Sequence, residues 1–107
     1  MSEYTPDVWV MVEIVSPEHG IVNKLLCGWY GGYLYGDSWK LSSGNLPEHE
    51  DGIYIVFPQE SGSVYRCHKE AQRFSGLTSS IFASYSKKLD ELGNGSSMKV
   101  VDYNHDK

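Results

Sequence analysis

The sequence predicts an α+β fold, in which an antiparallel sheet of five to six short strands is packed by one α-helix in the C-terminal half. Three observations support this class. Apolar residues alternate in short runs, turn residues separate the runs at intervals of about ten residues, and one later segment has helical periodicity. A small closed barrel with the same helix across one end is the alternative. The length of 107 residues predicts a single domain, 1–107.

The strands follow from alternation between turn signals. In chain order they are expected at 8–15, 21–30, 33–41, 53–57, 63–68 and 98–103. Gly28 lies inside the second strand and indicates a bulge or a close backbone approach. The third strand follows a tight turn at 31–32 and is interrupted at Gly36, and 46–51 is expected to be a charged loop. Trp29 and Trp39 are expected in the core, and Val100 is the residue of the last strand expected to be buried.

A helix is expected over 78–92. Thr78 is a favourable N-cap, and Leu77 and Phe82 occupy the two positions of a hydrophobic staple around it. Apolar residues then recur at three- and four-residue spacing, as on the buried face of an amphipathic helix. Gly93 stands where a left-handed C-terminal cap is expected.

The charge distribution and cysteine content bound the class of protein. The net charge is −5, divided into −7 over residues 1–60 and +2 over residues 61–107, so the basic excess typical of nucleic-acid binding is absent. No run of 18 apolar residues predicts a membrane span. Two cysteines are too few for a disulfide framework, which favours a reducing, cytoplasmic location. We expect no cofactor and no metal, because no ligand spacing is present.

One candidate anion-binding site lies around the Ser-Gly turn at 61–62. A Ser-Gly turn presents backbone N–H groups and hydroxyls, and basic side chains follow it on a strand. Arg66 and His68 are two residues apart and so share a face, while Cys67 faces the other way as a small core residue. An ordinary hairpin with a basic outer face is the alternative. The candidate residues are Ser61, Ser63, Arg66, His68, Lys69 and Arg73.

A second candidate lies in the segment 28–44, which is rich in glycine, tyrosine and tryptophan. Tyr33 and Tyr35 offer flat faces on which a base stacks. Asp37 and Ser38 are suited to hydrogen bonds with a ribose or a base edge, and Lys40 to a phosphate. The alternative is that these tyrosines lie half-buried between neighbouring strands.

Two motifs resemble small tailed-bacteriophage accessory proteins of unassigned function. They are Gly-Asp-Ser-Trp-Lys-Leu-Ser-Ser-Gly at 36–44 and Ser-Gly-Ser-Val-Tyr-Arg-Cys-His-Lys at 61–69, within a similar region of about half the chain, 12–69. The resemblance implies a protein made in the cytoplasm of an infected bacterium. Accessory proteins of this size often inhibit host defences, and some sequester nucleotide signals. It supplies no catalytic residues.

Together these features predict an anti-defence protein that sequesters a small anionic, nucleotide-derived ligand without catalysis, with its site at a homo-oligomer interface. A protein–protein inhibitor of a host enzyme or defence protein is the alternative, docking through exposed aromatic residues and an acidic face. A small phosphodiesterase-like hydrolase with His68 as acid or base is a further alternative. The sequence favours binding over catalysis, because no paired acid and base or activated nucleophile is present. No nucleic-acid or membrane partner is expected.

Overall fold

The computed structural model describes residues 2–103 of the chain. They adopt the predicted α+β class, with two four-stranded sheets and one main helix in the C-terminal half, and the sheets do not close into a barrel. The elements are β1 (Glu3–Tyr4), β2 (Val8–Ser16), β3 (Gly20–Trp29), α1 (Gly32–Tyr35), β4 (Ser38–Leu41), β5 (His49–Asp51), β6 (Tyr54–Pro58), β7 (Val64–His68), the 3₁₀ turn η1 (Lys69–Ala71), α2 (Gly76–Glu91) and β8 (Ser97–Val101).

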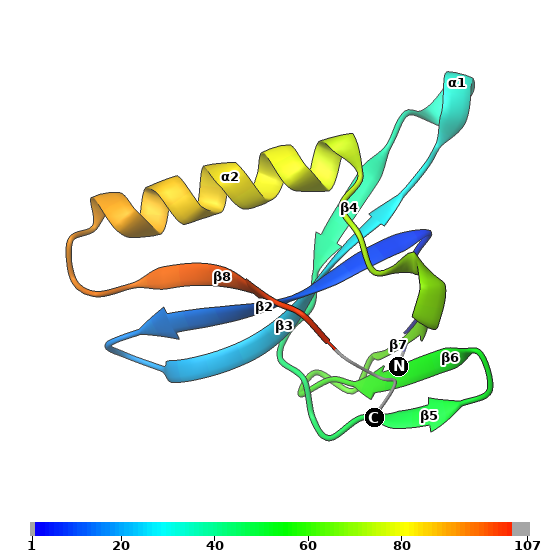
Figure 1. Ribbon diagram of the computed structural model, residues 1–107, viewed down its shortest axis with the longest axis horizontal. Helices are drawn as coiled ribbons and strands as arrows, with labels where there is room; N and C mark the ends of the chain where they lie inside the picture. Colours follow the sequence, from blue (N-terminus) through cyan, green and yellow to red (C-terminus); the bar gives the residue numbers. More distant parts are fainter. Residues whose placement is uncertain (1, 104–107) are drawn as a thin grey trace.

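The strands form two sheets, which we call sheet A and sheet B. Sheet A has the order β1-β7-β6-β5, and sheet B has the order β4-β3-β2-β8. All neighbouring strands are antiparallel except β1 and β7, which run parallel. α2 lies over one face of sheet B, and sheet A packs against the other face (Figure 1). The described chain is therefore built in three layers, with sheet B in the middle.

The middle position of sheet B explains why β2 is buried on both faces. Trp9 and Met11 join the apolar cluster between the two sheets, whereas Val10 and Val12 join the cluster beneath α2. Burial on one face only would leave alternate residues exposed, but all of Val8–Val12 is buried. Alternate residues of β2 therefore belong to two different cores, and neither face of the strand meets solvent over Val8–Val12.

The tryptophan at the centre of the molecule is Trp9. Its side chain is fully buried, and its Nε1 donates a hydrogen bond of 2.8 Å to the carbonyl oxygen of His68. Trp29 is only partly buried against this core. The prediction that Trp39 is a core residue is wrong, because Trp39 is 37% exposed and stands against the side of α2.

Gly28 marks a close approach, one of its two predicted roles, but the groups that approach it are side chains and not backbone. A Cβ atom at this position would lie 2.9 Å from Cγ2 of Thr78 and 3.1 Å from Oγ of Ser75, so a side chain here would push the start of α2 off sheet B. The N-cap of this helix is Ser75, whose Oγ accepts from the Thr78 backbone N–H at 3.1 Å. The predicted cap at Thr78 is wrong by three residues. Oγ1 of Thr78 instead accepts a hydrogen bond from the Ser75 backbone N–H, which completes a capping box.

Other boundaries also differ from the sequence prediction. The segment 33–41 is not one strand, because its first residues form the short helix α1, and β4 begins only at Ser38. The segment 46–51 is not wholly a loop, since β5 forms at its end as the outer strand of sheet A. In β8 the buried residue is Met98, and Val100 is 44% exposed. The left-handed conformation expected at Gly93 is present, with φ of 65°.

Within residues 2–103, no helix combines the length and the apolar character needed to cross a membrane.

Candidate functional site

The most unusual surface feature is the hairpin tip that joins β3 to β4, which we define as residues 30–37. Figure 1 shows α1 standing away from the rest of the chain at the end of this hairpin. The Gly36 N–H donates to the carbonyl oxygen of Gly32 at 3.1 Å and closes the turn. A Cβ atom at Gly31 would lie only 1.6 Å from the Gly36 carbonyl oxygen. The neck of the tip therefore requires glycine at Gly31, and Gly36 adopts a left-handed φ of 68°.

The tip presents three large apolar side chains that no other described part of the chain covers. Tyr33 is 102% exposed, Leu34 79% and Tyr35 86%. Apolar side chains of this size are normally at least half-buried in a folded domain, and contiguous exposed ones mark interaction sites. Both tyrosines were predicted as site residues from the sequence, but Leu34 was not. Its position between the two tyrosines could have indicated that it belongs to the same exposed surface.

The stem below the tip is held in place by the N-terminal segment and by α2. The Tyr30 backbone N–H donates to Oδ2 of Asp7 at 2.8 Å, and Nε1 of Trp29 donates to the Thr5 carbonyl oxygen at 3.1 Å. On the other strand, the ring of Trp39 meets the ring of Tyr85 edge to face, with centroids 6.1 Å apart. The arm is thus fixed at its base, and only its end extends away from the fold.

The remaining candidates of the aromatic segment lie at the base of the tip and along β4. Asp37 and Ser38 are exposed where the tip joins β4. Lys40 is farther down the strand, with its ammonium 5.2 Å from the centroid of the Tyr4 ring. Lys40, predicted to contact a phosphate, therefore lies away from Tyr33 and Tyr35 along the hairpin. Lys40 and the two tyrosines do not line one common cavity.

The second group of candidates lies on the outer face of sheet A. Arg66 and His68 share this face as predicted, with buried Cys67 between them on the inner side. Arg66 is engaged by two carboxylates: its Nη1 donates to Oδ2 of Asp51 at 2.5 Å, and its Nε lies 3.5 Å from Oε2 of Glu3. The hydrogen bond from Arg66 lowers the pKa of Asp51. Carboxylates of the chain itself thus occupy the guanidinium that was expected to bind an anion.

The neighbouring polar groups are similarly paired. The Lys69 ammonium contacts the Glu50 carboxylate, and Nδ1 of His68 accepts from the Glu70 backbone N–H at 3.0 Å. Arg73 is exposed and donates to the Glu70 carbonyl oxygen at 3.2 Å. An incoming anion at this face would have to compete with these contacts.

The predicted Ser-Gly turn lies at the other end of β7. The hydroxyl of Ser43 donates to Oγ of Ser61 at 3.1 Å, and Oγ of Ser43 accepts from the Ser61 N–H at 3.2 Å. Ser63 follows, with its N–H 3.5 Å from Oγ of Ser61. β7 runs its whole length between this turn and His68, so the structure divides the predicted anion site into two parts. Figure 1 shows both parts well separated from α1.

Cys27 and Cys67 are free thiols in the core between the sheets, and burial raises the pKa of Cys27. Among residues 2–103, no three His, Cys, Asp or Glu side chains form a group suited to holding a metal ion.

No protein-family model, curated protein or solved structure matches the chain. The candidate site therefore has to be judged on its own geometry.

Proposed function

We propose that this protein acts without catalysis by binding another protein through the hairpin tip, as an inhibitor or modulator of that partner. The observation that carries the proposal is the full exposure of Tyr33, Leu34 and Tyr35 at the end of a braced arm. Tyrosine is enriched among the residues that dominate binding energy at protein interfaces. A tip held closed by glycine backbone contacts loses little conformational freedom when it docks.

The chemistry of the tip also indicates the kind of partner. Its apolar residues require an apolar pocket or groove, and carboxylates of Asp7 and Asp37 lie at its base. The N-terminal 60 residues carry a net charge of −7. An apolar pocket with a basic rim on the partner would complement this surface, because opposite charges around an interface speed association and exclude wrong partners. The resemblance to phage accessory proteins fits an inhibitor of a host protein.

The alternative of sequestering an anionic ligand at Arg66 stays a prediction. The geometry favours it less, because Arg66 and Lys69 already contact Asp51, Glu3 and Glu50. Binding there would exchange existing ion pairs for new ones, so the net gain would be small.

A photo-crosslinking residue in place of Leu34 tests the proposal directly. Expressed in bacteria, this variant should form a covalent adduct with one protein, whereas the same substitution at Ile53, an exposed apolar residue on the turn of sheet A, should not. Equal adducts from both positions, or none from position 34, would contradict a docking role for the tip.

Affinity for the purified partner then measures the contribution of each side chain. Tyr33→Ser and Tyr35→Ser should each weaken binding by about 2 kcal/mol or more, the typical cost of truncating an interface hot spot. Ile53→Ser is the matched control and should have no effect. Gly31→Ala keeps every tip side chain but places its Cβ against the Gly36 carbonyl, so it should also weaken binding if the closed shape of the tip is required.

A further inference from the structure

A cleft of about 460 Å³ lies at the free end of the β2–β3 hairpin, away from the tip and from sheet A's outer face. The hairpin contributes Ile14, Ser16, His19 and Lys24 to its lining, and Ser43 and Glu60 complete it. This volume lies within the range of pockets that hold small organic ligands. None of these residues was assigned a role from the sequence.

Lys24 is the feature of the cleft that calls for a ligand. Its strand partner is Val12, so its side chain rises from the same face of sheet B as the hairpin residue Ile14. Among residues 2–103, its ammonium has no carboxylate within ion-pair distance, although the side chain is half-buried. His19 also lines the cleft, from the turn at the end of the hairpin, and its imidazole makes no hydrogen bond in the described part of the chain. The half-buried Lys24 ammonium, with no carboxylate of its own, is therefore the group of the cleft best suited to contact an anion.

The cleft also contains hydroxyl groups that can donate hydrogen bonds. Oγ of Ser16 accepts from the His19 backbone N–H at 3.1 Å, which leaves the hydroxyl proton of Ser16 free to donate. An ammonium together with a hydroxyl suits the charge and the acceptor oxygens of a phosphate group.

The remaining wall is acidic and lies against a glycine. A Cβ atom at Gly44 would lie 2.9 Å from Oε2 of Glu60, so this carboxylate lies directly against the Gly44 backbone. The Glu60 backbone N–H is also fixed, since it donates to the Gly44 carbonyl oxygen at 2.9 Å. A carboxylate in a ligand cleft accepts hydrogen bonds from ligand hydroxyls, as acidic residues do with the ribose of dinucleotides.

We propose that this cleft binds a small phosphorylated polyol, a sugar phosphate or a nucleoside monophosphate. The phosphate contacts Lys24, the sugar hydroxyls donate to Glu60, and the C–H face of the sugar lies on Ile14. This inference is independent of the proposed docking by the tip.

Amide chemical-shift titration by NMR tests the proposal, with ribose 5-phosphate, adenosine monophosphate, inorganic phosphate and ribose as probes. Either phosphate ester should shift the amides of residues 16–24, 43 and 60 at concentrations up to the millimolar range, and ribose alone should not. Lys24→Met keeps the apolar stem and should weaken binding about ten- to a hundredfold, the usual effect of losing a charged hydrogen bond. Lys99→Met, an equal change of charge at an exposed position of the same sheet, should not.

Glu60→Gln tests the contact with the sugar separately from the contact with the phosphate. It should reduce the preference for ribose 5-phosphate over inorganic phosphate and leave binding of inorganic phosphate intact. The proposal is overturned if no probe shifts these amides, if Lys24→Met and Lys99→Met have equal effects, or if wild-type protein binds inorganic phosphate as tightly as the ester. Tyr33→Ser should leave every titration unchanged, so failure here is distinguishable from failure of the docking proposal.

Discussion

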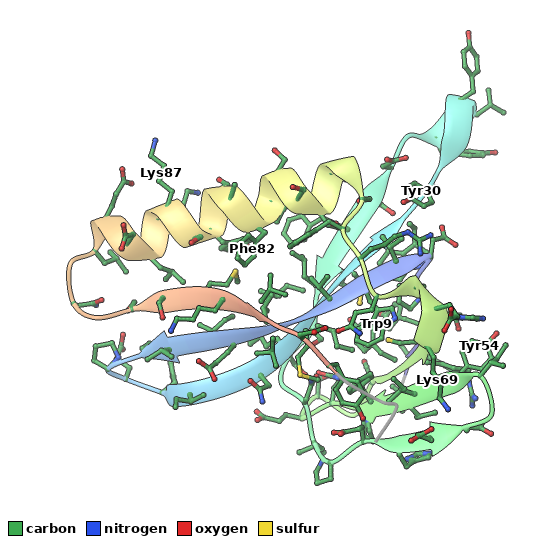
Figure 2. All side chains as sticks on the ribbon, viewed as in Figure 1. Trp9, Tyr30, Tyr54, Lys69, Phe82 and Lys87 are labelled. Carbon is green, nitrogen blue, oxygen red and sulfur yellow. The ribbon has the colours of Figure 1, made fainter. Side chains whose placement is uncertain are left out.

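The hairpin tip and the outer face of sheet A are built from similar residues but differ in their surroundings. Both carry tyrosine beside glycine turns, yet Tyr33 on the tip touches nothing, whereas Tyr54 on sheet A lies between Arg66 and His68. The difference arises because β6 has a strand on each side, whereas the tip extends beyond the end of sheet B. Figure 2 shows Tyr54 and Lys69 within this crowded end of the molecule. Residue type indicates what a surface can do, and neighbouring strands decide whether it remains available.

The largest expected effect comes from the same substitution made in each region. Tyr54→Ser removes an edge-to-face contact with His68 and a cation–π contact with Arg66, whose centre lies 5.5 Å from the ring centroid. It should lower the free energy of unfolding by about 1–2 kcal/mol, because cross-strand aromatic contacts contribute on this scale. Tyr33→Ser should change it by less than about 0.5 kcal/mol. Urea denaturation of both variants gives the comparison, and equal losses would show that the tip is packed in solution.

The sequence was sufficient to predict elements that depend only on residues close together in the chain. The strands near 8–15, 21–30 and 53–57 and the C-terminal end of α2 follow from apolar periodicity and from the glycine at position 93. The layer arrangement was not predictable in this way. The continuous apolar run over Val8–Val12 is typical of a strand buried on both faces, but it does not identify what covers each face. The core role of Trp9 therefore depends on contacts distant in the chain.

The candidate site shows the same division. The segment 33–41 was predicted as one strand, which is wrong for its first residues because the Gly36 N–H bonds back to Gly32. The shared face of Arg66 and His68 followed from strand periodicity. The pairing of Arg66 with Glu3 and Asp51 did not, since these carboxylates come from β1 and β5 and reach it only through the order of strands in sheet A.

A smaller effect is expected from Tyr103, whose hydroxyl donates to Oε2 of Glu48 at 3.1 Å beside sheet A. Burial, followed by the contact with Glu48, raises the pKa of Tyr103 from 10.0 to about 12. A raised pKa means that the neutral phenol is favoured in the folded protein. The resulting stabilisation is complete below pH 10 and is lost as the pH rises through about 12.

Comparison with Tyr103→Phe isolates this contribution, because the other tyrosines titrate in both proteins. The stability advantage of the wild-type protein over the variant should shrink between pH 10 and 12 in denaturation experiments. A constant difference across this interval would show that the hydroxyl does not contact Glu48 in solution.

The smallest expected effect concerns the ion pair between Arg66 and Asp51, which is solvent-exposed. Arg66 lowers the pKa of Asp51 below its ordinary value of 3.8, so the pair stabilises the fold above that pH and ceases to do so as the pH falls through the lower, folded value. Arg66→Met should therefore be slightly less stable than the wild-type protein at neutral pH. This difference should shrink in acid, where only the contact of Arg66 with the Tyr54 ring remains, and it should also diminish in high salt because exposed charges are screened.

Lys87→Met is the matched control, because Lys87 projects from the exposed side of α2 (Figure 2) and forms no ion pair in the described part of the chain. Its stability relative to the wild-type protein should not depend on acid or salt in this way. If Arg66→Met behaved like Lys87→Met, Arg66 would be free of its carboxylates in solution. The outer face of sheet A would then be as available to an anion as the tip is to a protein, and the sequence-based site at Arg66 would regain support over the pairing seen in the structure.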